Sequence, residues 1–229
     1  MEVEIWSDIA CPWCYIGKRR LEAAMAQFEH ADEVRLTWRS FELDPAAPAE
    51  IPGDAEALLA EKYGVSVGQA RQMQQRVADV AAADGLDYHL GEARMGSTFD
   101  GHRMIHLAAE HGLQDQMKER LLRARLIEGR LVSDHDTLVE LAAEVGLPED
   151  EVREALASDR FAAEVREDEQ TARRFGITGV PMFVVDRELG ASGAQPPELL
   201  LSLLRQGWEN RAPAISVVEG GDSCDVDGC

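Results

Sequence analysis

The chain has 229 residues, of which 45% are hydrophobic, so it can bury a substantial core as one domain or as one domain that carries a large insertion. Its formal net charge of −20, from 23 basic and 43 acidic residues, repels nucleic acid and anionic membrane surfaces, so we expect neither as a partner. No apolar run approaches the length of about 18 residues that a membrane-spanning helix needs. The first residues carry neither a basic segment nor a long apolar segment, so we expect no secretory leader and a cytoplasmic location.

The chain opens with a strand pattern, a helix pattern and a second strand pattern. Residues 3–6 read Val-Glu-Ile-Trp, and residues 34–43 alternate apolar and polar side chains, as half-buried strands do. Between them, apolar side chains recur at the spacing of one helix face: Leu21, Ala24, Met25 and Phe28. Residues 1–43 therefore predict a strand–helix–strand unit whose two strands are parallel neighbours in one sheet.

A long helical stretch follows a loop that is rich in proline. Asp54 and Ser66 have the side-chain types that cap helix N-termini, and amphipathic patterns continue from there. We expect successive helices over residues 54–64, 66–85, 98–108, 114–128, 134–145, 148–157 and 159–175. No repeat of fixed period connects them, so residues 44–175 are predicted to form an all-helical insertion.

The last part of the chain returns to strand patterns. Residues 177–186 predict a strand that starts at Pro181, and residues 191–193 predict a second, short strand. Pro196 and Pro197 then open a final helix with an apolar stripe. The order strand–helix–strand, helical insertion, strand–strand–helix is that of a split thioredoxin-like α/β fold. Its core would be residues 1–43 and 176–212, and residues 213–229 would be a flexible tail.

The motif Cys11-Pro12-Trp13-Cys14 lies where the first strand pattern meets the first helix pattern. A helix N-terminus favours a thiolate, because it carries unpaired N–H groups and a positive partial charge; we therefore expect a lowered pKa at Cys11, the candidate nucleophile. Cys14, one turn inside the helix, would resolve a mixed disulfide formed at Cys11. A zinc half-site and a static disulfide are the alternatives for an isolated pair of this spacing.

Three segments together resemble the DsbA-like thioredoxin family, in particular its FrnE-like branch, over about residues 1–210. They are the CPWC motif continuing as Tyr-Ile-Gly-Lys-Arg-Arg, the segment Thr178-Gly179-Val180-Pro181, and the turn Ser192-Gly193-Ala194-Gln195-Pro196. The resemblance implies a thiol–disulfide oxidoreductase in which Val180–Pro181 is a cis peptide beside the cysteine pair. It also implies that Pro12, Trp13, Val180 and Pro181 contact the substrate. Without the cysteines, Pro181 would be read as an ordinary proline at the start of a strand.

Trp13 stands where the better-known, periplasmic members of this family carry a histidine. A protonated histidine would help to hold the thiolate, so its absence suggests a less depressed Cys11 pKa and a less oxidising pair. The direction of electron flow therefore stays open between oxidase, reductase and isomerase. We expect protein or small-molecule thiols and disulfides as partners, a monomer or homodimer, and no cofactor apart from the redox-active disulfide, with glutathione as a candidate small-molecule thiol.

Glutathione-dependent isomerases and transferases of the 2-hydroxychromene-2-carboxylate and kappa types share this split architecture and are the alternative function. These relatives typically carry a serine at the position of Cys11, and an acidic residue near the turn that here reads Ser192-Gly193-Ala194-Gln195. Both differences favour the oxidoreductase. A third possibility is a non-enzymatic binding module, either a polypeptide-binding scaffold or a zinc protein.

Cys224 and Cys229 form a second, C-x-x-x-x-C pair in the glycine- and aspartate-rich tail. They could be an auxiliary redox pair that exchanges disulfides with the CPWC motif, could lack a catalytic role, or could join the first pair around one zinc ion. We place the auxiliary redox pair first.

His102, His106 and Glu110 are spaced four residues apart on one expected helix, a spacing that can bind metal. Three ligands that step along one helix span two turns, and a single ion does not easily reach all three. We therefore predict no metal site here. His102-Arg103 matches an Ala-His-Arg element associated with the resembling family, with Gly101 in place of the alanine, and no role is assigned to it.

Overall fold

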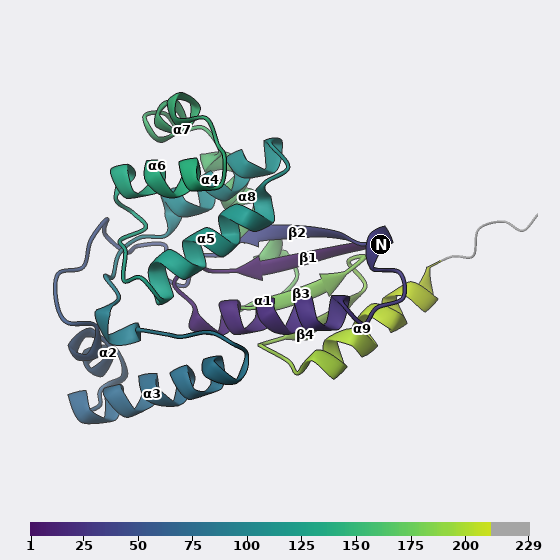
Figure 1. The fold of residues 1–229 in the computed structure, drawn as a ribbon, viewed down its shortest axis with the longest axis horizontal. Coiled ribbons are helices and arrows are strands. Elements are labelled where there is room, and N and C mark those ends of the chain that lie inside the picture. The colour runs from purple at the N-terminus through teal and green to yellow at the C-terminus, as the bar shows by residue number, and fades with distance from the viewer. Residues whose placement is uncertain (212–229) are drawn as a thin grey trace, which may run out of the picture.

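A mixed four-stranded sheet forms the centre of the computed structural model, which describes residues 1–211 (Figure 1). The strand order is β2–β1–β3–β4, and the strands are β1 (Glu2–Ser7), β2 (Arg35–Ser40), β3 (Met182–Val185) and β4 (Leu189–Ser192). β1 pairs parallel with β2 and antiparallel with β3, and Ile5 lies opposite both Trp38 and Phe183. The predicted parallel strand–helix–strand unit and the returning pair of strands are confirmed.

The two faces of β1 pack against different helices, because successive side chains of a strand point to opposite sides. Val3 and Ile5 belong to a buried cluster with α1 (Pro12–Met25) and α9 (Pro197–Asn210). On the other face Trp6 packs against Ala172 of α8 (Ala162–Arg174). The sheet is therefore covered on both sides. This packing holds the C-terminal end of β1 in place, and the chain continues from there into the CPWC motif.

The segment between β2 and β3 is helical, as the sequence predicts. Its helices are α2 (Ala55–Tyr63), α3 (Val67–Ala83), α4 (Phe99–Glu110), α5 (Gln114–Leu126), α6 (His135–Glu144), α7 (Glu149–Leu156) and α8; short 3₁₀ turns lie at Ala31–Glu33, before β2, and at Leu90–Glu92. Asp54 caps α2 by accepting hydrogen bonds from the N–H groups of Glu56 and Ala57. Ser66 caps α3 in a reciprocal capping box with Gln69, so both predicted helix starts are confirmed.

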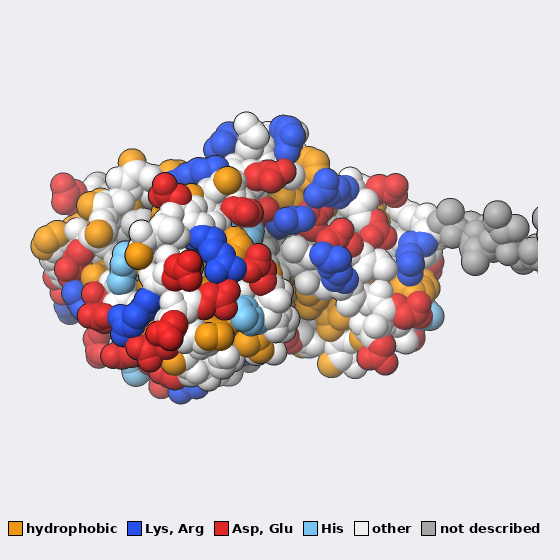
Figure 2. Space-filling model, turned by 90° about the horizontal axis from the view of Figure 1, so that it is seen from above, with side chains coloured by type: hydrophobic (Ala, Val, Ile, Leu, Met, Phe, Trp, Pro, Cys, Tyr) orange, Lys and Arg blue, Asp and Glu red, His pale blue; other side chains and the backbone are white. Residues whose placement is uncertain are grey.

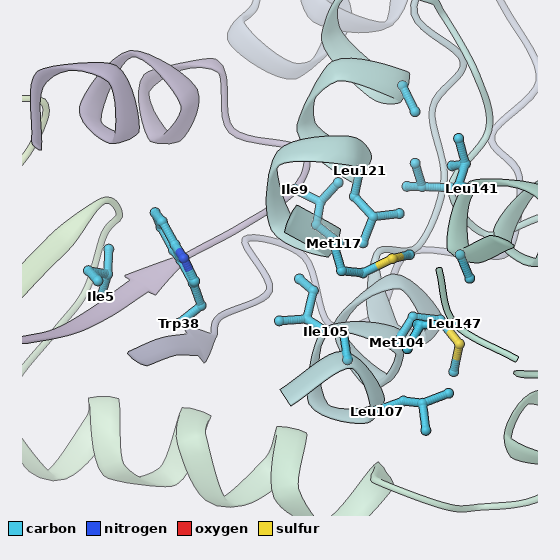
Figure 3. Packing of buried hydrophobic residues seen from close by; sticks show 14 of the residues in the cluster. Ile5, Ile9, Trp38, Met104, Ile105, Leu107, Met117, Leu121, Leu141 and Leu147 are labelled. Atoms are coloured by element: carbon cyan, nitrogen blue, oxygen red, sulfur yellow. The ribbon is translucent and has the colours of Figure 1, made fainter. Parts of the chain in front are cut away.

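The inserted helices share one buried core with the sheet. Figure 3 shows Met117 and Leu121 of α5 and Met104 of α4 packed around Ile9, which follows β1. In contrast, α2 and α3 lie to one side of this core, near the N-terminal end of α1 (Figure 1). The CPWC motif is thus flanked by helices that come from distant parts of the sequence.

Two expectations at the edges of elements differ from the structure. The strand predicted to start at Pro181 begins one residue later, at Met182, after a bend that brings Pro181 against α1. The second short strand begins at Leu189 rather than at residue 191. No helix within residues 1–211 is long and apolar enough to cross a membrane. The predicted tail with Cys224 and Cys229 lies outside the described residues.

Acidic and basic side chains alternate on the face of the molecule shown in Figure 2. Many charged side chains of the described residues pair, for example Arg120 with Glu144 at 2.6 Å and Arg160 with Glu110 at 2.6 Å. Interspersed charges of this kind create no broad basic field on this face.

Candidate active site

The CPWC motif forms the first turn of α1. Cys11 is the N-cap residue with an extended backbone (φ −88°, ψ 114°), and Pro12 occupies the first helical position, where a missing N–H costs nothing. The N–H of Cys14 donates to the carbonyl oxygen of Cys11 at 3.1 Å. Cys11 is 5% exposed, Cys14 is fully buried, and both are free thiols. The difference in exposure makes Cys11 the thiol that an incoming disulfide can reach.

The peptide bond between Val180 and Pro181 is cis, as the resemblance implies. Cys11 Sγ lies 3.6 Å from the carbonyl oxygen of Val180. Pro181 packs directly on α1, because a Cβ atom at Gly17 would lie only 2.9 Å from Pro181 Cγ. The structure therefore brings the Val180–Pro181 segment next to the cysteine pair, although Val180 follows Cys11 by 169 residues in the sequence.

A fully buried lysine lies behind the cysteine pair. Lys118 of α5 donates from Nζ to the carbonyl oxygen of Ser7 at 3.1 Å, and its Nζ lies 5.6 Å from the centroid of the Trp38 ring. Burial lowers the pKa of Lys118 to about 8, although the negative charges of a Cys14 thiolate and of Asp8 act in the opposite direction. Lys118 is thus a buried cation close to Cys14.

The two thiols titrate as a pair. The pKa of Cys11 is raised well above its usual value, because its thiol donates a hydrogen bond to the Cys14 sulfur and because it is buried. Burial also acts to raise the pKa of Cys14, but the hydrogen bond from Cys11 and the charge of Lys118 outweigh it and lower the pKa. The expectation of a lowered Cys11 pKa is therefore wrong for the resting dithiol. The reason is the hydrogen bond between the two thiols together with the burial of Cys11, and the charge of Lys118 further favours a thiolate at Cys14.

Asp8 is a second buried charged group beside the motif. Its carboxylate accepts hydrogen bonds from the N–H groups of Leu43 at 2.7 Å and Ala10 at 3.2 Å, and it lies 3.4 Å from Nε2 of His102. Burial raises the pKa of Asp8, but the contact with His102 and the two N–H groups outweigh burial and lower it. Burial lowers the pKa of His102, and the nearby Lys118 charge lowers it further. Asp8, His102 and Lys118 together form a buried charged cluster under the cysteine pair.

Tyr88 connects the helical insertion to the motif. Its hydroxyl donates to the carbonyl oxygen of Pro12 at 2.6 Å, and its ring stacks on Tyr15 with centroids 6.2 Å apart. Burial raises the pKa of Tyr88 well above that of a free tyrosine, so the hydroxyl stays a donor. The contact therefore holds the first turn of α1 against the segment that follows α3.

A cavity of about 600 Å³ opens beside Cys11, between the motif and the helices α2 and α3. Trp13, which is 39% exposed, lines it together with Met73 and Val77 of α3. Cys11, Pro12 and Trp13 all border this space, whereas Cys14 does not. The candidate nucleophile therefore faces a chamber that is large enough for a small molecule.

The three side chains with metal-binding spacing on α4 have three different partners. His102 contacts Asp8, His106 Nε2 lies 3.1 Å from an oxygen of Asp168, and Glu110 pairs with Arg160. Among residues 1–211, no group of three or more His, Cys, Asp or Glu side chains is arranged to hold a metal ion. His102 instead gains a role that the sequence left open, as the partner of Asp8.

Sequence reasoning missed four candidate site residues: Asp8, Tyr88, Lys118 and Arg125, of which Arg125 lines the cavity beside Cys11. The sequence contains a signal for Asp8. This acidic residue directly follows an apolar strand and stands three residues before Cys11, so its side chain is expected near the thiols. Lys118 and Arg125 carried none, because α5 reads Lys-Glu-Arg-Leu-Leu-Arg-Ala-Arg over residues 118–125, the composition of an ordinary solvent-facing helix.

Comparison with known proteins agrees with this geometry. An uncharacterized Bacillus subtilis protein, YwbO, is 26% identical over 216 residues, which cover 88% of this chain and 96% of that protein. The crystal structure of a probable DsbA oxidoreductase from Streptomyces coelicolor shares 45% identity and a TM-score of 0.90, covering 100% of this chain and 98% of its own. A 2-hydroxychromene-2-carboxylate isomerase has a similar fold, at 16% identity and a TM-score of 0.67, covering 93% of this chain and 100% of its own. Residues 2–205 match the DSBA-like thioredoxin domain, and the chain belongs to this family.

Proposed function

We propose that this protein is a thiol–disulfide oxidoreductase of the FrnE-like branch that exchanges disulfides with protein or small-molecule substrates, as a monomer or homodimer. The observation that carries the proposal is the asymmetry of the pair. Cys11 borders the cavity and the Val180 carbonyl, whereas Cys14 is fully buried next to the Lys118 cation. One thiol is placed to meet the substrate and the other to be held as a thiolate.

The first half of the reaction opens the substrate disulfide. The Cys11 proton passes along the hydrogen bond to the Cys14 sulfur, and the Cys11 thiolate attacks one sulfur of the substrate. A mixed disulfide forms at Cys11, and the other half of the substrate leaves as a thiolate. That thiolate takes up the proton that Cys14 now carries.

The second half releases the remaining thiol. The Cys14 thiolate, stabilised by Lys118, attacks Cys11 Sγ, and the bond between Cys11 and the substrate breaks. The departing thiolate is protonated by water, so the substrate gains two electrons and two protons while Cys11 and Cys14 become a disulfide. The same steps in reverse oxidise a dithiol. The potential of the pair against glutathione decides which direction prevails.

Substitution of each cysteine tests these roles separately. Cys11→Ser should abolish the reduction of insulin by dithiothreitol, because no other described thiol borders the substrate side. Cys14→Ser should instead accumulate a mixed disulfide at Cys11, detected by mass spectrometry of the intact protein. Undiminished turnover in Cys11→Ser would refute the proposal.

The second pair, Cys224 and Cys229, is proposed to exchange disulfides with the CPWC pair. The end of α9 and the motif lie at opposite ends of the molecule (Figure 1). The motif is at the start of α1, and this helix is only about 21 Å long, at about 1.5 Å per residue. The thirteen residues from 211 to 224 can span up to about 45 Å when extended. Redox titration of the protein against a Cys224→Ser/Cys229→Ser variant tests this role, and identical titrations would argue against it.

A further inference from the structure

The cavity beside Cys11 has a mainly apolar wall with one buried cation in it. Its lining includes Met73 and Val77 of α3, Leu90 and Leu126, and at the surface the exposed rings of Trp13 and Tyr63. Arg125, near the C-terminal end of α5, lines the same cavity and is only 3% exposed. A volume of about 600 Å³ is the size of a pocket for a small organic molecule rather than a folded partner.

Arg125 has no counter-ion among the described residues. Its guanidinium donates to the carbonyl oxygen of Arg94 and lies 2.9 Å from the sulfur of Met95, and its Nε has no hydrogen-bond partner. Within residues 1–211 no carboxylate comes within 4 Å of it to form an ion pair. Burial lowers the pKa of Arg125 to about 10, which reflects the cost of this unpaired charge. Buried cations are normally paired, so the site is incomplete without an anion.

The two acidic side chains that line the cavity do not supply that anion. Asp8 attracts Arg125 through space, but its oxygens are already used by Leu43, Ala10 and His102. Asp44 is exposed and accepts a hydrogen bond from the N–H of Ala46. The protein as a whole carries a charge of −20 and repels anions, so an anion that enters must be drawn by a local cation.

We infer that the cavity binds a low-molecular-weight disulfide whose apolar or aromatic body lies against α3 and whose carboxylate pairs with Arg125, presenting its sulfurs to Cys11. This inference rests on the proposed thiol–disulfide exchange and specifies its substrate class. The bond that breaks is the substrate disulfide, and the Cys11–Cys14 dithiol supplies both electrons, so the products are two substrate thiols and the enzyme disulfide. The carboxylate keeps its charge throughout and serves only to position the molecule.

Two aromatic disulfides that differ in charge test the role of Arg125. The reduced protein is mixed with 5,5′-dithiobis(2-nitrobenzoate), which carries carboxylates, or with 4,4′-dithiodipyridine, which does not, and the released chromophore is followed by stopped flow. Arg125→Met should slow the reaction with the carboxylated disulfide by about 10- to 100-fold, the scale of one charge-assisted hydrogen bond. The reaction with the uncharged disulfide should change by less than about threefold.

Matched variants exclude a general effect of charge. Arg123 lies on the same helix but is exposed and pairs with Glu128, so Arg123→Gln removes one positive charge without touching the cavity. It should leave the ratio of the two rates unchanged, whereas Arg125→Lys should restore part of the preference. An equal loss with both disulfides in Arg125→Met would overturn the inference.

A binding experiment separates this inference from the proposed exchange reaction. In a Cys11→Ser/Cys14→Ser background, calorimetry should show that 2-naphthoate binds about tenfold more tightly than 2-naphthamide, and that Arg125→Met removes the difference. Equal affinities, or no binding of either compound, would refute the cavity's role even if insulin reduction by the native protein succeeds. Conversely, selective binding without redox activity would refute only the exchange reaction.

A second variant keeps the inference testable if Arg125→Met does not fold. Val77 lines the cavity on α3 and is only half-buried, so Val77→Phe fills the apolar side without removing a hydrogen bond. It should slow both aromatic disulfides and leave the small bis(2-hydroxyethyl) disulfide unaffected. An unchanged rate with the aromatic disulfides would contradict their placement in the cavity.

Discussion

At the scale of single residues, the chemistry of the pair depends on which sulfur has a cation beside it. Cys11 sits at the helix N-terminus, and the helix dipole alone would favour its thiolate. The hydrogen bond from Cys11 to the Cys14 sulfur and the charge of Lys118 together reverse that preference in the resting dithiol, because both stabilise a thiolate at Cys14. Cys14 is therefore favoured as the thiolate of the resting pair, while Cys11 borders the cavity.

Lys118→Met should make the pair less oxidising. Removing the cation raises the pKa of Cys14 and destabilises the reduced state, by about 1 to 2 kcal/mol or about 20 to 40 mV for a two-electron couple. Because the pKa of Lys118 is about 8, the wild type loses the same charge as the pH rises, so the difference should be largest below pH 8 and shrink above it. Redox titration against glutathione at pH 7 and pH 9 measures both effects.

Lys62→Met is the control for that titration, because Lys62 is an exposed lysine of α2 that borders the cavity. Its removal should leave the potential within error. If Lys118→Met also leaves the potential unchanged at pH 7, the cation does not act on Cys14.

At the scale of elements, the site depends on the close approach of α1 to the turn before β3. Gly17 permits this approach, since a Cβ atom there would lie 2.9 Å from Pro181 Cγ and 3.2 Å from Phe183 Cζ. Any larger residue forces the turn away from the helix that carries Cys11. The glycine in the middle of α1 is thus explained by contact rather than by backbone conformation.

Gly17→Ala should destabilise the protein by about 1 to 3 kcal/mol, the usual cost of overpacking a core contact. Urea unfolding measures the change. Gly68→Ala in α3 is the matched control: a Cβ atom at Gly68 meets nothing within 4 Å, so that alanine should be neutral or stabilising by up to about 1 kcal/mol. Similar destabilisation in both variants would mean that contact with Pro181 is not the cause.

Local pattern explains how much of this architecture the sequence could predict. Strand alternation, helix periodicity and caps such as Asp54 are encoded within a few residues, and they were sufficient for the element order and the location of Cys11 and Cys14. The packing of Pro181 against Gly17, in contrast, joins segments that are far apart in the chain and has no local signal. Lys118 and Arg125 become site residues only because α5 packs under the start of α1, a long-range contact with no local signal.

At the scale of the whole molecule, several buried carboxylates bind the sheet to the inserted helices. Arg39 of β2 pairs with Glu4 of β1 at 2.7 Å and with Asp168 of α8 at 3.1 Å. Glu42, after β2, and Glu169 of α8 both contact Arg166 of the same helix. The stability of the assembled fold should therefore depend on pH through such pairs.

The contribution of Glu42 to this pH dependence has the opposite direction to that of most carboxylates, because its pKa is raised on folding. Burial raises its pKa to about 7, with Glu169 adding repulsion, although Arg166 acts to lower it. A carboxyl whose pKa is raised on folding contributes stability below its unfolded pKa of 4.5, and this contribution is lost as the pH rises through 7. Because Arg166 is half-exposed and solvent screens the group, we expect an effect of only about 1 to 2 kcal/mol.

Glutamine is uncharged at every pH, so Glu42→Gln should remove the contribution of Glu42 to the change of the unfolding free energy with pH. The measurement is the difference in unfolding free energy between variant and wild type at pH 5 and pH 8, with the variant gaining relative to the wild type at pH 8. A difference that does not vary with pH would show that Glu42 titrates normally.

The complete burial of Cys14 also bears on damage by oxidants. Hydrogen peroxide can reach Cys11 and convert it to a sulfenic acid, but Cys14 offers it no surface. The neighbouring Cys14 thiolate then attacks the sulfenic acid sulfur, displacing hydroxide and closing the disulfide, before a second peroxide can carry Cys11 to the irreversible sulfinic acid. The burial that prepares Cys14 to resolve mixed disulfides thereby also shields the pair from permanent inactivation under oxidative stress.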